Sequence, residues 1–385
     1  MRGICLNRIS QYTYRNTKVN MNITIHDIIS EIERFAPLSY QESYDNAGLV
    51  TGDRNAVISS VLLCFDVTEE IIDEAIMKKA GLVISHHPVI FGGLKKITGN
   101  SATERIVIKA IQNNIALYAA HTNLDNAQGG INTTLAQKLG LKDIKILVPK
   151  ENMLYKVVTF VPESHAEKVR EAMFAADAGH IGNYDSCSYN ISGTGTFRAG
   201  EDTNPYVGEK GQLHYEPEVR IETIVREENL HTVIFSLKQN HPYEEPAYDI
   251  YPLENKYYNA GTGAIGQLEK AISATNFFET IKKTLPVKVI RHNKLFKDIK
   301  TVAVCGGSGS PFINDAIRAK ADIFVTGDCK YHQFLDYQDK IIIADIGHYE
   351  SECFAIEIFY NVIIKKFPNF VVYFSHNGNN PVYYF

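Results

Sequence analysis

The sequence predicts an α/β protein in which two related α/β units form one cleft and carry an inserted α+β domain. Short apolar runs alternate with helical patterns in both halves of the chain. Residues 61–88 align without a gap with residues 302–329, so that Cys64 falls on Cys305. A repeat of this length indicates two related units and not a solenoid. The segment between the halves has a different order of elements, which indicates an insertion.

The first α/β unit is expected at residues 21–150. Thr68 precedes a helical pattern with acids in its first turn and lysines in its last, as capping and the helix dipole favour. The apolar runs on either side of this helix make a βαβ unit with a parallel sheet. The elements expected here are helices at residues 23–34 and about 103–113, and strands at residues 59–66, 82–85 and 115–120.

The second α/β unit is expected at residues 255–385. Residues 323–326 fall on the strand at residues 82–85 when the two halves are aligned, and residues 341–344 form the next strand. A single long helix is expected from His348 to about Lys366.

The inserted domain is expected at residues 151–254. Its order, βαββαβ, predicts a ferredoxin-like module. The expected elements are strands at residues 155–161, 184–192 and 218–225, helices at 165–176 and 227–239, and a loop rich in Gly, Asn and Pro at 193–211. The closing segment contains His241, Glu244 and Glu245, which either bind a metal or belong to a packed, hydrogen-bonded loop; we favour the packed loop.

Composition excludes several classes of protein. The chain has 385 residues, of which 45% are hydrophobic and 22% charged, as in ordinary globular proteins. The net charge of −5 argues against a nucleic-acid partner, and no apolar run is long enough for a membrane span. The six cysteines form no CxxC pair, which fits a cytoplasmic protein with reduced thiols. Residues 1–20 lack an apolar region and are interpreted as a tail or a mis-called start.

Several side chains that can bind metals follow strands of the predicted sheets. An adjacent histidine pair is by itself compatible with a structural role, and a His/Glu pair four residues apart is common on exposed helices. Parallel strands, however, bring their carboxyl ends to one edge of a sheet, where α/β proteins bind ligands. The sequence therefore predicts a metal site at this edge. The residues concerned are His86, His87, His121, Asp125, Asp328, His348 and Glu352.

The segment Gly306-Gly307-Ser308-Gly309-Ser310-Pro311 follows a strand and opens a helix. Its backbone amides could bind a phosphate or another anion, and the alternative is a tight turn. It lacks the Gly-Lys-Ser/Thr ending of a P-loop, so kinase or ATPase chemistry is not indicated.

The motifs Ser-His86-His87-Pro, His121-Thr-Asn-Leu-Asp125, Cys-Gly-Gly-Ser-Gly and Gly347-His348-x3-Glu352 resemble the NIF-three-like family, also called GTP cyclohydrolase I type 2 homologues. The likeness runs from about residue 23 to residue 385. The segment ending in HPYEEPAYD resembles the P-II/CutA-like insert of the longer members.

This resemblance implies a toroidal homohexamer, a trimer of dimers, with two divalent metals per subunit. Zinc, iron, manganese and nickel all suit imidazole and carboxylate ligands. The implied ligands are His86, His87, Asp125, His348 and Glu352. In the family's pattern Glu352 bridges, His87 and Asp125 complete one site, and His86 and His348 complete the other. Asp45, His121, Asp328 and His332 are implied to be outer-shell or substrate-facing groups.

A two-metal site of this kind is suited to hydrolysis. We expect a metal-dependent hydrolase of a nucleotide-like, phosphorylated or cyclic small molecule. His121 or Asp328 would move protons, His332 would face the substrate, and Gly306, Gly307 and Ser308 would hold an anion. The alternative is a non-catalytic metal-binding or regulatory assembly that holds a protein or nucleic-acid partner.

Overall fold

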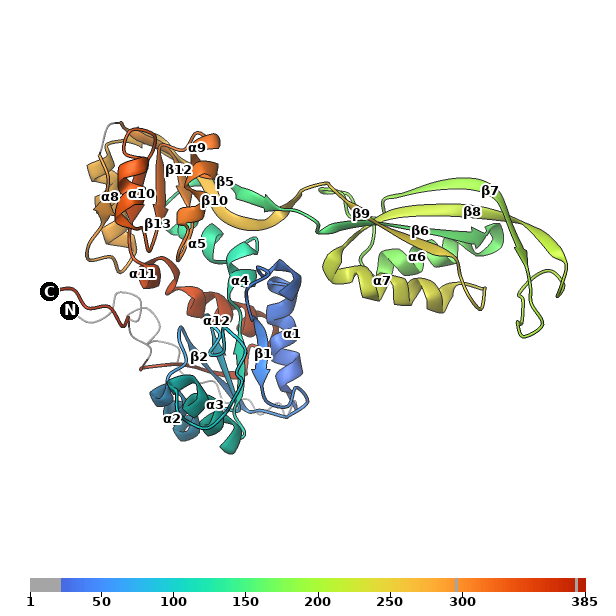
Figure 1. Ribbon diagram of the computed structural model, residues 1–385, viewed down its shortest axis with the longest axis horizontal. Coiled ribbons are helices and arrows are strands. Elements are labelled where there is room, and N and C mark those ends of the chain that lie inside the picture. The colour runs from blue at the N-terminus through green and yellow to red at the C-terminus, as the bar shows by residue number, and fades with distance from the viewer. Residues whose placement is uncertain (1–21, 295–296, 378–379) are drawn as a thin grey trace. The chain divides into compact units, whose positions relative to one another are not determined.

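The computed structural model describes residues 22–294, 297–377 and 380–385. The chain divides into two compact units (Figure 1), which we call the core unit (Met1–Pro149 with Tyr258–Phe385) and the inserted unit (Lys150–Tyr257). The interpretation of residues 1–20 as a tail or a mis-called start lies outside the described residues.

The first half of the core unit supplies most of the first sheet and its helices. The strands are β1 (Gly48–Thr51), β2 (Ser60–Cys64), β3 (Leu82–Ser85) and β4 (Ala116–Ala119), joined near the end of the chain by β15 (Val371–Phe374). The helices are α1 (Ile25–Phe35), α2 (Glu69–Lys78), α3 (Ala102–Gln112), α4 (Thr122–Asn126) and α5 (Ile131–Lys138). The strand order is β1-β4-β3-β2-β15, with β1 antiparallel to β4 and the other strands parallel.

The second half of the core unit builds a sheet with the order β11-β14-β13-β12-β10-β5. Its strands are β5 (Lys142–Lys150), β10 (Tyr257–Ile272), β11 (Arg291–His292), β12 (Ile299–Val304), β13 (Ile323–Thr326) and β14 (Ile342–Asp345). The helices are α8 (Ala274–Thr284), α9 (Ile313–Arg318), α10 (Tyr331–Asp336), α11 (His348–Glu352) and α12 (Ala355–Lys366).

The two sheets confirm the predicted pair of related α/β units. The strands β2, β3 and β4 are parallel neighbours in the first sheet, and β12, β13 and β14 are parallel neighbours in the same order in the second. Every residue of β2, β3, β4, β13 and β14 is buried, as continuous apolar runs in parallel sheets require. Thr68 caps α2 as predicted, because its hydroxyl accepts a hydrogen bond from the amide of Ile71.

Two strands belong to the sheet of the other half. β5 precedes the inserted unit in the chain but lies beside β10 in the second sheet, and β15 lies beside β2 in the first sheet. Each of the ranges predicted for the two α/β units, residues 21–150 and 255–385, therefore contains one strand that lies in the sheet of the other unit.

The inserted unit has the order β6 (Leu154–Pro162), α6 (Ala166–Ala175), β7 (Ser188–Arg198), β8 (Leu213–Arg226), α7 (Glu227–Asn240) and β9 (Tyr248–Leu253). Its antiparallel sheet has the order β7-β8-β6-β9. Both helices lie on the same side of this sheet (Figure 1) and pack on Val157, Ile221 and Val225.

The predicted loop at residues 193–211 is wrong in its first part. β7 continues through Gly193 and Gly195 to Arg198, which pairs with Leu213 of β8. A Cβ atom at Gly195 would lie 2.1 Å from Oε2 of Glu218. Glycine is thus needed here for the close approach of a neighbouring side chain, and its presence does not mark a loop.

The single helix predicted from His348 to about Lys366 is also wrong, because two helices occupy this segment. After Glu352 the chain turns at the buried Phe354, whose carbonyl accepts hydrogen bonds from the amides of Glu357 and Ile358 as α12 begins. In the described ranges, no helix combines the length and apolarity that a bilayer crossing requires.

Candidate metal centre

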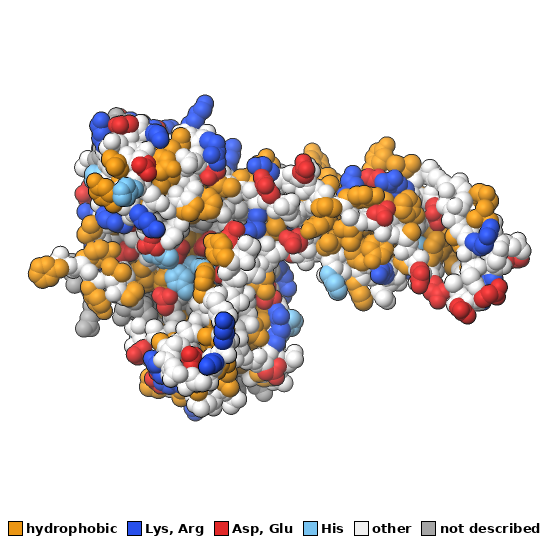
Figure 2. Space-filling model, viewed as in Figure 1, with side chains coloured by type: hydrophobic (Ala, Val, Ile, Leu, Met, Phe, Trp, Pro, Cys, Tyr) orange, Lys and Arg blue, Asp and Glu red, His pale blue; other side chains and the backbone are white. Residues whose placement is uncertain are grey.

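Six side chains that can bind metals converge in the core unit. They come from segments that follow the carboxyl ends of parallel strands in both sheets, as the sequence predicts. The six are His86 and His87 after β3, His121 after β4, Asp125 in α4, and His348 and Glu352 in α11. Figure 2 shows histidine side chains, in pale blue, gathered in a hollow of this unit with acidic side chains beside them.

Glu352 lies at the middle of the cluster. Its Oε2 atom is 3.1 Å from Nε2 of His348, 3.5 Å from Nε2 of His86 and 3.6 Å from Nε2 of His87. Oδ1 of Asp125 lies 3.6 Å from Nε2 of His86. The i, i+4 spacing of His348 and Glu352 places both on one face of the short helix α11.

The ligand atoms form three overlapping groups, each with its atoms within 4.8 Å of one another. The groups are His86 with Asp125 and Glu352, His87 with His348 and Glu352, and His86 with His87 and His121. Glu352 is shared, as the resemblance implies, but the pairing around it differs. The structure groups His86 with Asp125 and His87 with His348, because Nε2 of His87 lies 3.3 Å from Nε2 of His348. This grouping of the ligand atoms differs from the pairing taken from the family's pattern.

Two carboxylates hold the imidazoles of His87 and His348 in place. The Nδ1 atom of His87 lies 2.7 Å from Oδ1 of Asp66, and Nδ1 of His348 lies 2.7 Å from Oδ2 of Asp328. A carboxylate can only accept, so Nδ1 carries the proton in both rings and Nε2 of the neutral imidazole keeps its lone pair for the cluster.

The other two imidazoles are oriented in the same way. Nδ1 of His86 donates to the carbonyl of Ala120 at 2.9 Å, and Nδ1 of His121 donates to Oδ1 of Asp45 at 2.8 Å. Asp45 is itself fixed, since its Oδ2 accepts a hydrogen bond from the amide of Thr122 at 3.0 Å. All four histidines therefore direct Nε2 toward the cluster, the arrangement found around protein-bound metals.

Three buried polar atoms of the cluster lack a hydrogen-bond partner among the described residues. They are Nε2 of His86, Oδ1 of Asp125 and Oε2 of Glu352. A buried polar group without a partner costs about 1–3 kcal/mol, and more when it is charged. A divalent cation would satisfy all three atoms at once, so the residues present fit a metal site.

The carboxylates of Asp125 and Glu352 share one buried site, and their pKa values shift in opposite directions. Burial, together with the nearby Glu352, raises the pKa of Asp125 well above its usual range. Burial would do the same to Glu352, but the imidazoles of His348, His86 and His87 beside its carboxylate hold the pKa of Glu352 well below its usual range. Two carboxylates in one buried site need a compensating positive charge.

Without a metal, two imidazoles supply that charge. Burial lowers the pKa of His87, but its bonds to Asp66 and Glu352 outweigh burial and raise the pKa to about 10. At His348, Glu352 and Asp328 likewise outweigh burial and raise the pKa to about 9. A cation that binds Nε2 of these rings has to displace protons.

The glycine loop makes room for the central carboxylate. A Cβ atom at Gly307, which has φ +57°, would lie 2.3 Å from Oε1 of Glu352, and one at Gly306 would lie 3.0 Å from its Cγ. The amide of Gly307 donates to Oγ of Ser351, and the amide of Gly306 donates to Oδ1 of Asn132. These amides are thus used within the protein, which favours the tight-turn interpretation of Gly306, Gly307 and Ser308 over an anion site.

The remaining predicted residues divide into two kinds. Asp328 touches the cluster through His348 and also accepts a hydrogen bond from the hydroxyl of Ser308. His332 is exposed on α10, where its ring lies against that of Tyr331, and in the described ranges it makes no contact with the six side chains. Sequence reasoning missed Asp66, although it follows β2 at the same sheet edge as the histidine pair, and that position was the signal that could have found it.

In the inserted unit, the interpretation of the segment at His241 as a packed loop is confirmed. The imidazole bonds to the carbonyl of Phe160 through Nε2 and accepts from the amide of Tyr243 through Nδ1. Both ring nitrogens are thus used, and neither is free to bind a metal.

The chain is similar to a family of known proteins over nearly its full length. The family model described as Duf34/NIF3 (NGG1p interacting factor 3) matches residues 23–381. Two curated relatives, both named GTP cyclohydrolase 1 type 2 homolog, come from Halalkalibacterium halodurans and Bacillus subtilis. The first is 45% identical over 83% of this chain and 87% of the relative, and the second is 39% identical over 84% and 88%.

A solved structure supports the same relationship. The crystal structure of a Bacillus cereus protein related to NIF3 is 40% identical and matches with a TM-score of 0.81. The match covers 95% of this chain and 100% of that protein's chain. The likeness extends through both sheets and the inserted segment.

Proposed function

The chain belongs to the Duf34/NIF3 family, and from that premise we propose that its core unit is a two-metal hydrolase. Its substrate would be a nucleotide-like, phosphorylated or cyclic small molecule. The observation that carries this proposal is a set of buried atoms that can bind a metal and that have no hydrogen-bond partner in the described part of the chain: Nε2 of His86, Oδ1 of Asp125 and Oε2 of Glu352.

The ligand groups suggest how two divalent ions would be held. His86 and Asp125 would serve one ion, His87 and His348 the other, and Glu352 both. Zinc, iron, manganese and nickel all accept such ligands. When bound, these ions supply Lewis-acid chemistry that polarises a carbonyl or phosphoryl oxygen and lowers the pKa of water.

His121 is the best candidate for proton transfer. Its Nδ1 atom donates to Asp45, so that Nε2 can accept a proton beside the rings of His86 and His87, whose centroids lie 5.4 and 5.3 Å away. A positive charge formed on His121 would be stabilised by the buried carboxylate of Asp45. Asp328, the other candidate, is already bonded to His348 and Ser308 and is better suited to orienting the imidazole.

A pocket of about 460 Å³ opens beside the cluster and is lined by His87, His348 and Asp328. Arg291 also lines it, with its guanidinium held by Asp345 and by the carbonyl of Cys329. An arginine at this position can bind a phosphate or carboxylate of the substrate. The name of the curated relatives makes a guanine nucleotide one of the substrates to test.

We also propose that the chain assembles as a homohexamer, a trimer of dimers. Full-length similarity to the Bacillus cereus protein supports a common fold for each subunit. Light scattering of the purified full chain tests the assembly: a mass of six subunits is expected, and a monomer would contradict it.

The enzymatic proposal is tested by measuring metal content and turnover on the same preparation. We expect about two divalent ions per chain, and hydrolysis of at least one member of a panel of phosphoesters, nucleoside triphosphates and cyclic amides. The Glu352→Gln variant should lose metal and turnover together. The His121→Gln variant should keep its metal and lose turnover. His332→Gln changes an exposed imidazole outside the cluster and serves as the matched control.

A metal-loaded chain without turnover on the whole panel would contradict the hydrolase. It would favour the alternative, a metal-binding or regulatory assembly. A chain that binds no divalent ion would contradict both.

A further inference from the structure

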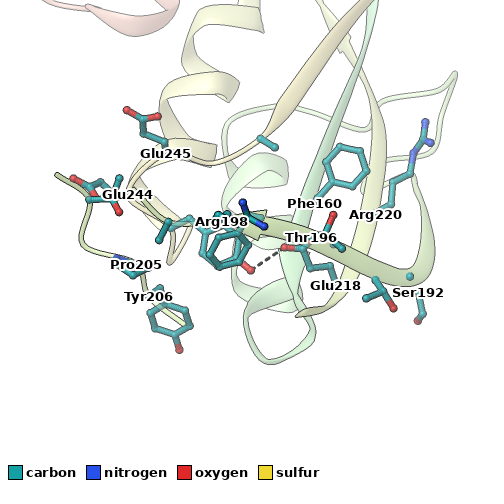
Figure 3. Close-up of a pocket in the computed structure, with 18 of the residues that line it drawn as sticks. Phe160, Ser192, Thr196, Arg198, Pro205, Tyr206, Glu218, Arg220, Glu244 and Glu245 are labelled. Carbon is teal, nitrogen blue, oxygen red and sulfur yellow. Dashed lines mark hydrogen bonds between the residues drawn. The ribbon is translucent and has the colours of Figure 1, made fainter. Parts of the chain in front are cut away.

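The inserted unit contains a pocket of about 670 Å³ that the core unit's chemistry does not use (Figure 3). Its wall includes Phe160 of β6 and Arg220 of β8, which pair in register and therefore share one face of the sheet. The residues next to them, Val161 and Ile221, pack against the helices on the opposite face. The pocket thus lies on the face that α6 and α7 leave uncovered.

Glu218 is the buried charge of this pocket. The residue is only 8% exposed, and its Oε1 accepts a hydrogen bond from the hydroxyl of Tyr243 at 2.8 Å. Among the described residues, no hydrogen bond or ion pair reaches its second oxygen, Oε2. A buried carboxylate is costly unless a donor or a cation satisfies it. Oε2 is therefore free to accept a hydrogen bond from a ligand that enters the pocket.

Aromatic rings line the space around this carboxylate. The ring of Tyr243 lies 5.9 Å from that of Phe197 and 6.3 Å from that of Tyr206, measured between centroids. All three residues line the pocket. Aromatic faces attract organic cations and bury the methylene groups that carry them.

The charges of the lining favour a positively charged ligand. The acids are Asp202, Glu218, Glu244 and Glu245, and the bases are Arg198 and Arg220. Arg220 is already paired with Glu222 at 2.8 Å, and Figure 3 shows its guanidinium directed away from Glu218. The lining therefore carries four carboxylates, of which that of Glu244 also accepts a hydrogen bond from the amide of Asn204. Arg198 is its one guanidinium that is not ion-paired within the described part of the chain.

We propose that this pocket binds a small organic amine with several ammonium groups, of the linear polyamine class. A primary ammonium would donate to Oε2 of Glu218 and lie against the aromatic rings. Further ammonium groups of the polyamine would reach the exposed carboxylates of Asp202, Glu244 and Glu245. A trimethylammonium group has no N–H donor and cannot satisfy Glu218 in this way.

The experiment is titration calorimetry of the full chain with spermidine, butylamine and tetramethylammonium at physiological ionic strength. Wild-type protein should bind spermidine saturably, butylamine more weakly, and tetramethylammonium weakest. Glu218→Gln keeps an acceptor for the hydroxyl of Tyr243 but removes the negative charge. It should lower the affinity for spermidine at least about tenfold. Glu254→Gln, an exposed change outside the pocket lining, should leave the affinity unchanged.

Arg198 distinguishes a cationic ligand from an anionic one. Because Arg198→Gln removes a like charge, it should strengthen spermidine binding about two- to fivefold. Weaker amine binding in this variant would overturn the proposal. If circular dichroism shows that Glu218→Gln does not fold, the double variant Asp202→Asn/Glu245→Gln replaces it. This double variant should lower the affinity for spermidine more than the affinity for butylamine.

Three further results would also overturn the proposal. The first is that spermidine does not bind saturably to the wild-type protein. The second is that Glu218→Gln binds spermidine with wild-type affinity. The third is that tetramethylammonium binds the wild-type protein as tightly as spermidine does. The Glu352→Gln variant should bind spermidine like wild type, because Glu352 belongs to the core unit. Lost binding in that variant would assign the amine to the metal centre.

Discussion

Replacing Gly307 by alanine should remove the metal while leaving every metal ligand in the sequence. The added methyl group would lie 2.3 Å from Oε1 of Glu352 and 3.4 Å from Cε1 of His348. Both are ligand side chains of the candidate centre. The Gly307→Ala change therefore tests whether the glycine loop makes room for the carboxylate.

Two effects of the substitution can be separated. Alanine at φ +57° is in the left-handed region, which costs about 1–2 kcal/mol of folding stability. In addition, a normal contact distance requires the Glu352 carboxylate to move by about 1 Å. A displacement of that size is enough to disturb a metal site, so the affinity for metal should fall at least about 100-fold.

Gly140 offers a matched control. It has φ +78°, and a Cβ atom there would meet no other atom within 4 Å. Gly140→Ala should lose a similar 1–2 kcal/mol of stability and keep its metal. The assay is metal content by mass spectrometry after dialysis, together with denaturant unfolding of both variants. Equal metal content in Gly307→Ala and Gly140→Ala would refute the reasoning.

Three further outcomes are expected. Asp66→Asn and Asp328→Asn each remove the charge that orients an imidazole, that of His87 or that of His348, and each should weaken metal binding about 10- to 100-fold in a competition assay with a chelator. Wild-type metal affinity in both variants would show that these carboxylates are not needed to orient the imidazoles. The pKa of Asp45 is lowered to about 2, since its bonds with His121 and Thr122 outweigh burial. Its contribution of about 2 kcal/mol is therefore present above pH 4 and lost as the pH falls toward 2, so the stability gap between metal-free wild type and Asp45→Asn should narrow over that range in denaturant unfolding and not stay constant. Thr68→Ala removes the cap of α2 and should cost about 1 kcal/mol in the same assay; no change would show that water replaces the cap.

The positions of the candidate metal ligands can be predicted from the sequence because they depend on a simple rule. Short apolar runs predict parallel strands, and side chains of the segments that follow these strands gather at one edge. His86, His87, Asp125, His348 and Glu352 all obey this rule and meet in the structure. The same rule applies to Asp66 after β2.

The pairing of ligands could not be predicted in the same way. His86 and His87 are neighbours directly after β3, and the directions of their rings depend on bonds to Ala120 and Asp66. Such bonds join segments that are distant in the chain. The exchange of β5 and β15 between the sheets also depends on long-range pairing.

Glycine caused the other errors. Gly193, Gly195 and the pair Gly306-Gly307 indicate turns or loops when only local preference is considered. In the structure, Gly195 and Gly307 are instead positions where another side chain comes too close for a Cβ atom. That requirement is a property of the packed neighbours Glu218 and Glu352, and a single sequence does not show it.

The attachment of the inserted unit has a consequence for how the protein can be divided. The segment enters after β5 and returns through β10, which are neighbours in the second sheet, and within it β6 and β9 pair at Leu154 and Leu253. The strands that flank the insertion, β5 and β10, are neighbours in their sheet, and so are β6 and β9, the first and last strands of the inserted unit. The inserted unit therefore takes the place of a turn between β5 and β10. A short turn in its place would join β5 to β10, and the shortened chain would retain every residue of the candidate metal centre. The candidate metal centre and the pocket of the inserted unit can therefore be altered independently of each other.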